Sequence, residues 1–196
     1  PVALRPPSAE RLTSHMAIDA ATRVSLELLE TQRGAERGSL RHEIDLTVTP
    51  PGSRLLARRL AAPLCDAGRI NARLDAVSTF VADGLVTQRL RAELKAVPDL
   101  TRALTRLALG RGGPRDLKAV GTAVSGAIAL ADRLGTIAGP PAEIAAIIAC
   151  LADAPAALAA ELADAVDDEP PLLARDGGFV RKGYDATLDV ERALAS

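Results

Sequence analysis

Aromatic residues are scarce in this sequence: it has two phenylalanines, one tyrosine and no tryptophan among 196 residues. Its 48% hydrophobic content is therefore mostly alanine, leucine and valine. Alanine and leucine have the most favourable helix propensities, and a chain of this length can bury a substantial core. The composition therefore favours an all-α fold.

Cysteines and long apolar runs are also few. Cys65 and Cys150 lie far apart and form no CxxC pair, which argues against a disulfide framework and fits a reduced compartment. No apolar run reaches the roughly 20 residues of a membrane span. The first residues contain prolines and charges where a signal peptide would have an apolar stretch. These absences predict a cytoplasmic protein with no membrane partner.

A strong net charge is absent as well, because 24 basic side chains balance 25 acidic ones to give −1. The chain thus lacks the electrostatic signature of a protein that binds nucleic acid by itself. Two small basic clusters remain, and we take their members as candidates for weak phosphate contacts. Such clusters are also typical of solvated faces and of ion-pair donors. The candidates are Arg54, Arg58, Arg59, Arg181 and Lys182.

The sequence contains no recognisable motif for catalysis, for cofactor binding or for metal binding. The segment LGRGGPRDLK (residues 109–118) lacks the G-K-[ST] of a phosphate loop, and Pro114 removes one N–H donor. The spacings of the histidines and cysteines match no zinc finger or ribbon, and neither cysteine stands in an activating sequence. We therefore predict no catalytic, cofactor or metal site in this chain.

Helix-start chemistry recurs along the sequence. A capping side chain or a glycine–proline pair precedes each of five helix-like segments. These starts are Thr49–Pro50, Asp66, Asp99, Gly113–Pro114 and Asp153.

Apolar residues within these segments recur with a period near 3.6, so each segment is predicted to bury one face. The longest stripe consists of Leu117, Val120, Val124, Ile128 and Leu134. A second stripe consists of Ile70, Leu74, Val77 and Val81.

Two segments are less regular. HEIDLTVT (residues 42–49) alternates like a short strand, but it also fits a helix that begins at Ser39 and ends near Asp45. GGFVR (residues 177–181) reads as an extended piece between glycines, so we expect a short β-hairpin-like element near Phe179. The predicted fold is an irregular multi-helix bundle with this one extended piece.

Five strings occur in an order and spacing that resemble the core, or lever, region of the MutS family of DNA mismatch repair proteins. They are MAIDAATRVSLELLE (residues 16–30), IDLTVTPPGSRLLARRLAAPL (44–64), INARLDAVSTF (70–80), PRDL (114–117) and RDGGFVRKGYDATLD (175–189).

The resemblance implies a domain organisation. Residues 1–15 would be a linker from a preceding mismatch-reading domain, and residues 16–183 the core/lever domain. Residues 184–196 would begin the long helix that leads into the DNA clamp. The chain would then be a piece of a longer protein whose ATPase domain follows it.

The resemblance also implies a function. The domain would couple the ATP state of the ATPase domain to the clamp and would have no enzymatic activity of its own. ATP and Mg would be cofactors of the parent protein, and its partners would be mismatched double-stranded DNA, a second copy of itself and a MutL-type repair protein. An autonomous α-helical interaction module is the alternative, and the five ordered strings disfavour it.

Overall fold

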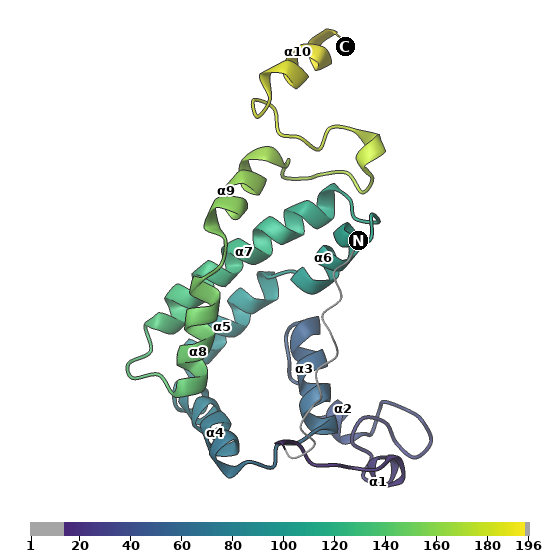
Figure 1. Ribbon diagram of the computed structural model, residues 1–196, viewed down its shortest axis with the longest axis vertical. Coiled ribbons are helices and arrows are strands. Elements are labelled where there is room, and N and C mark those ends of the chain that lie inside the picture. The colour runs from purple at the N-terminus through teal and green to yellow at the C-terminus, as the bar shows by residue number, and fades with distance from the viewer. Residues whose placement is uncertain (1–13, 195–196) are drawn as a thin grey trace. The chain divides into compact units, whose positions relative to one another are not determined.

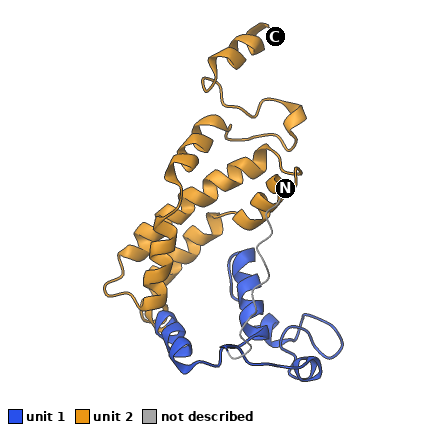
Figure 2. Cartoon of the chain, in the orientation of Figure 1, with its two compact units in different colours: residues 1–77 blue, residues 78–196 orange. Residues whose placement is uncertain are grey.

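The structure, a computed structural model, describes residues 14–194. The predicted linker at residues 1–15 lies outside this range except for Ser14 and His15. The chain divides into two compact units, residues 1–77 and residues 78–196, which Figure 2 shows in different colours.

The described part of the first unit contains short helices with side-chain caps. They are α1 (Ala20–Ser25), α2 (Leu40–Ile44), α3 (Pro50–Ala61) and most of α4 (Ala67–Ala82). Asp19 caps α1 by accepting a hydrogen bond from the amide of Thr22 at 2.9 Å. Thr49 caps α3 in the same way at 3.1 Å through the amide of Gly52, as its position before Pro50 predicts.

Residues 42–49 form a helix end and not a strand. The hydroxyl of Ser39, which is fully buried, accepts a hydrogen bond from the amide of His42 at 3.2 Å and so starts α2. The alternating Ile44 and Leu46 are 44% and 75% exposed, so no sheet uses that alternation. The helical alternative is therefore confirmed, because a local cap decides the conformation of so short a segment.

The second unit is built on one long helix. It contains α5 (Gly84–Ala96), α6 (Leu100–Ala108), α7 (Pro114–Gly135), α8 (Ala142–Ala152), α9 (Ala156–Ala165), the 3₁₀ turn η2 (Ala174–Asp176) and α10 (Ala186–Leu194). Helices α5, α6, α8 and α9 each pack against α7 (Figure 1). The all-α prediction is confirmed, and α7 is the centre of this unit.

The core of the second unit confirms the stripe predicted for α7. Val120, Val124 and Leu134 are buried, and Leu100 and Leu107 of α6 pack against the cluster that contains the two valines. The start of α7 is also as predicted, because the carboxylate of Asp116 accepts a hydrogen bond at 2.9 Å from the amide of Gly113.

The buried face predicted for α4 is wrong. The side chains of the expected stripe are exposed, and Ala76 is the buried residue of this helix. The exposed fractions are 37% for Ile70, 54% for Leu74, 52% for Val77 and 79% for Val81. Periodicity identified the helix correctly, but a stripe does not specify whether another element covers it.

The helix start predicted at Asp153 is also wrong. Asp153 is the C-terminal cap of α8, and α9 begins at Ala156 after Pro155 without a side-chain cap. Proline has a fixed φ and needs no N–H donor at a helix start, so Pro155 determines this boundary.

The extended piece near Phe179 is present as a single antiparallel bridge between Val166 and Val180. The amide of Asp167 donates to the carbonyl of Phe179 at 2.9 Å, and the amide of Arg181 donates to the carbonyl of Ala165 at 2.8 Å. The extended piece thus pairs with the residue that follows α9 through this one bridge, and residues 14–194 contain no strand and no β-hairpin.

No single helix within residues 14–194 has the length and hydropathy needed to cross a membrane. Helices α8 and α9 have the required length and hydropathy only when they are taken together, and the chain bends by 50° between them.

Candidate functional site

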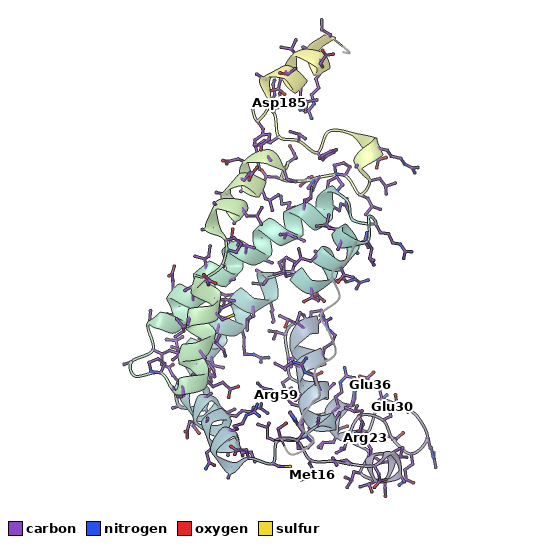
Figure 3. The ribbon with its side chains drawn as sticks, in the orientation of Figure 1. Met16, Arg23, Glu30, Glu36, Arg59 and Asp185 are labelled. Atoms are coloured by element: carbon purple, nitrogen blue, oxygen red, sulfur yellow. The ribbon has the colours of Figure 1, made fainter. Side chains whose placement is uncertain are left out.

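The first basic cluster lies on α3. Its cap at Thr49 and the proline that follows start the helix, which places Arg54 and Arg58 one turn apart. Both are exposed, whereas Arg59 is half-buried; Figure 3 labels Arg59. Arg54 and Arg59 each take part in an interaction within the chain. Two of the three arginines therefore interact with other parts of the chain, while Arg54 and Arg58 are exposed to solvent.

The two residues of the second cluster, Arg181 and Lys182, differ in their surroundings. Arg181 forms a two-pronged ion pair with Asp168, at 3.1 Å to Oδ2 and 3.0 Å to Oδ1, and also donates to the carbonyl of Val166 at 3.2 Å. Hydrogen bonding and charge from Arg181, followed by those from Lys118, lower the pKa of Asp168 below its ordinary value. The neighbouring Lys182 is exposed. Arg181 thus serves as an ion-pair donor within the chain, and phosphate contact by these five residues stays a prediction.

A polar cluster between α2 and α3 was not found by sequence analysis. The hydroxyl of Ser53 donates to Oδ2 of Asp45 at 2.5 Å and accepts from Nη2 of Arg41 at 3.1 Å. The amide and hydroxyl of Thr47 donate to Oδ1 of Asp45 at 3.0 and 2.6 Å. The one available signal is the Asp–x–Thr spacing at residues 45–47, which is typical of a turn closed by a side chain.

This serine is not arranged as a nucleophile. The hydroxyls of Ser53 and Thr47, with the Thr47 amide, lower the pKa of Asp45 from 3.8 to about 2. A carboxylate so weakly basic is poorly suited to take the serine proton near neutral pH, where a general base needs a pKa close to the working pH. The cluster instead ties the end of α2 to the first turn of α3.

The pKa of Asp45 is testable. The cluster's contribution to stability should be present above the ordinary pKa of 3.8 and should be lost as the pH falls through about 2, because the folded protein holds the carboxylate ionised. In Ser53→Ala the largest cause of the shift is removed, so the pKa of Asp45 should rise toward 3.8. NMR titration of the carboxyl carbon measures it, with Ser125→Ala as the control. Titration of Asp45 near 3.8 in the unsubstituted protein would contradict the assignment.

No group of three or more histidine, cysteine or acidic side chains within the described range is placed to hold a metal ion. The described residues are all-α, and the helices α5, α6, α8 and α9 of the second unit are organised around α7.

Comparison with known proteins identifies the family. The family model described as MutS domain III matches residues 21–195. The DNA mismatch repair protein MutS of Rhodopseudomonas palustris (strain BisB5) is 53% identical over 97% of this chain and 21% of its own length. The proteins of the same name from Nitrobacter winogradskyi and Azorhizobium caulinodans are 51% and 50% identical, over 97% and 98% of the chain and 22% and 20% of their own lengths.

The chain therefore belongs to the MutS family, as the five ordered strings predicted. It spans about a fifth of the length of the curated relatives it matches. The boundaries predicted after residues 15 and 183 stay predictions.

Proposed function

We propose that this chain is the coupling domain of a DNA mismatch repair protein, and that it links the nucleotide state of an ATPase domain to the hold of a clamp on mismatched double-stranded DNA. The observation that carries the proposal is the match of residues 21–195 to MutS domain III. The packing around α7 supports it, because a coupling element has to move as a rigid body between a few arrangements.

Close approach at two glycines of α7 supports this rigidity. A Cβ at Gly121 would lie 3.0 Å from Cβ of Leu162 in α9, and one at Gly126 would lie 2.7 Å from Cγ2 of Val97. Such close contacts are typical of densely packed interiors, which deform little. We therefore expect α7 and the segments packed on it to move together.

The proposal includes the chemistry of the whole protein. ATP and Mg would act in a domain outside this chain, and the protein would function in the cytoplasm as a homodimer with a MutL-type partner. Coupling between two binding equilibria is reciprocal, so mismatched DNA in the clamp must change nucleotide affinity by the same factor as nucleotide changes DNA affinity.

A domain exchange tests the proposal. The matching segment of the Rhodopseudomonas palustris (strain BisB5) protein is replaced by this chain, and affinity for mismatched DNA and ATP turnover are measured. Both should be retained, together with the effect of ATP on DNA affinity. An exchanged protein that folds and binds DNA, but whose DNA affinity no longer responds to ATP, would favour the independent interaction module.

The chain by itself should bind DNA weakly and without preference for a mismatch. Arg54 and Arg58 are exposed but few, so the affinity should be low. Because it would come mostly from counterion release, it should fall as salt rises, with a slope near −0.9 for each phosphate contacted. Fluorescence anisotropy with matched and mismatched duplexes measures this. Arg58→Ala should reduce the salt slope by about 0.9, the value for one phosphate contact, whereas Arg175→Ala should leave the slope unchanged. Preference for the mismatch at physiological salt would contradict the prediction.

A further inference from the structure

The segment between α9 and the bridge at Val180 is attached to α7 by charged side chains. We call residues 167–172 the strap. Nζ of Lys118 donates to the carbonyl of Asp167 at 3.4 Å and to the carbonyl of Asp168. Nε of Arg115, one turn earlier on α7, donates to the carbonyl of Pro170 at 3.0 Å. Cations of α7 thus hold three backbone carbonyls of the strap.

Arg181 fastens the strap to the chain that follows it. Its guanidinium binds both carboxylate oxygens of Asp168 and the carbonyl of Val166, beside the backbone bridge between Val166 and Val180. Asp168 therefore lies between Lys118 of α7 and Arg181 of the outgoing chain. The exposed carboxylate of Asp168 thus joins a cation of α7 to a cation of the outgoing chain.

The last helix depends on the same kind of contact. Helix α10 has no buried residue in the described structure. Nη2 of Arg192 donates to the carbonyl of Val180 at 3.1 Å, and Asp189 accepts from the amide of Gly183 at 2.7 Å. Figure 1 shows α10 beyond the strap and apart from the helices that pack on α7. Polar contacts therefore carry much of its attachment.

Solvent reaches these contacts. Lys118 and Asp168 line two open hollows, one shared with Lys95 and Arg115 and the other with Arg181. The Asp168 side chain is 77% exposed, and those of Lys118 and Arg181 are 35% and 38% exposed. Exposed ion pairs contribute little and are screened by salt, whereas the apolar core around α7 is not weakened in this way.

We propose that the strap is a salt-sensitive hinge: when the Lys118–Asp168–Arg181 contacts are screened or removed, α10 swings away while the helices packed on α7 keep their arrangement. The inference concerns this chain alone and goes beyond the proposed coupling function. Its physical basis is the difference between the exposed ion pairs of Asp168, which join α7 to Arg181, and the apolar, buried core around α7.

The distance between two spin labels tests the hinge in the full 196-residue chain. Both native cysteines are exposed and free, so Cys65→Ser and Cys150→Ser give a background for labelling. One label is placed at Ala129 on α7 and the other at Val190 on α10, both exposed. A second pair of labels, at Ala129 and at Ala160 on α9, reports on the arrangement of the helices packed on α7. Double electron–electron resonance gives the distribution of each distance.

The expected result separates the two pairs. Raising NaCl from about 0.05 M to about 0.5 M should broaden the Ala129–Val190 distribution about two-fold and leave Ala129–Ala160 unchanged. Arg181→Met should give the broad distribution at both salt concentrations. Arg175→Met, at an arginine with an 82% exposed side chain in the same segment, should behave like the unsubstituted protein.

A conservative replacement adds a test of the ion pair itself. Arg181→Lys keeps a cation beside Asp168 and leaves the Lys118 contact unchanged, so it should keep part of the narrow distribution at low salt that Arg181→Met loses. The proposal is overturned if salt leaves the Ala129–Val190 distribution unchanged in the unsubstituted protein. It is equally overturned if both pairs broaden together, because the body would then be opening with the strap.

Discussion

Replacing Ile144 by alanine is expected to lower the free energy of unfolding by about 3 kcal/mol, since a buried isoleucine that is truncated leaves a cavity that its neighbours fill only partly. Ile144 is 1% exposed and lies on α8, which packs on α7. Urea denaturation followed by circular dichroism measures the change.

Ile147 on the same helix provides the control, because it is 44% exposed. Ile147→Ala should change the free energy of unfolding by only about 0.5 kcal/mol. Equal losses for the two substitutions would show that α8 does not use the Ile144 side to pack on α7.

Replacing Gly113 by alanine is expected to lower the free energy of unfolding by about 1 to 3 kcal/mol, because the added methyl group overpacks a close contact. The backbone of Gly113 is extended, with φ −131° and ψ −174°, so its conformation alone does not require glycine. A Cβ there would lie 2.6 Å from the carbonyl oxygen of Leu172 in the strap. Because that oxygen belongs to the backbone, either the start of α7 or the strap has to shift.

Gly135 at the other end of α7 is the matched control, since a Cβ there meets no atom within 4 Å. Gly135→Ala should be neutral or raise the stability by up to about 1 kcal/mol through helix propensity. Thermal unfolding of both variants measures the difference. A neutral result for Gly113→Ala would mean that Leu172 does not approach α7 as the structure places it.

Local signals in the sequence predicted the helices best. The cap at Thr49 and the Gly113–Pro114 start with Asp116 act within one helical turn, so they can be recognised without knowledge of the fold. Helix α5 gave no comparable prediction. It begins after the capping Asp83, but it buries only Leu90 and leaves Leu85 57% exposed, so its apolar pattern is weak.

The sequence did not predict which helix faces are covered or which charged residues pair with each other. The stripe on α4 is as regular as that on α7, and only packing distinguishes the exposed stripe from the buried one. The basic residue Arg181 was recognised as a candidate, but its partner Asp168 lies 13 residues away, and Lys118 lies 50 residues from the same carboxylate. Pairs at such separations are set by the fold, so a charge count finds the cations without finding what they bind.

The most direct test of coupling perturbs the packing on α7 inside a whole protein. In the domain-exchanged Rhodopseudomonas palustris protein, the factor by which ATP changes affinity for mismatched DNA is compared between Ile144→Val and Ile147→Val. Ile144→Val should change this coupling factor about three-fold, while DNA affinity without nucleotide changes little and Ile147→Val has no effect. An unaltered coupling factor in Ile144→Val, with the stability of the domain measurably lowered, would contradict a coupling role for this domain.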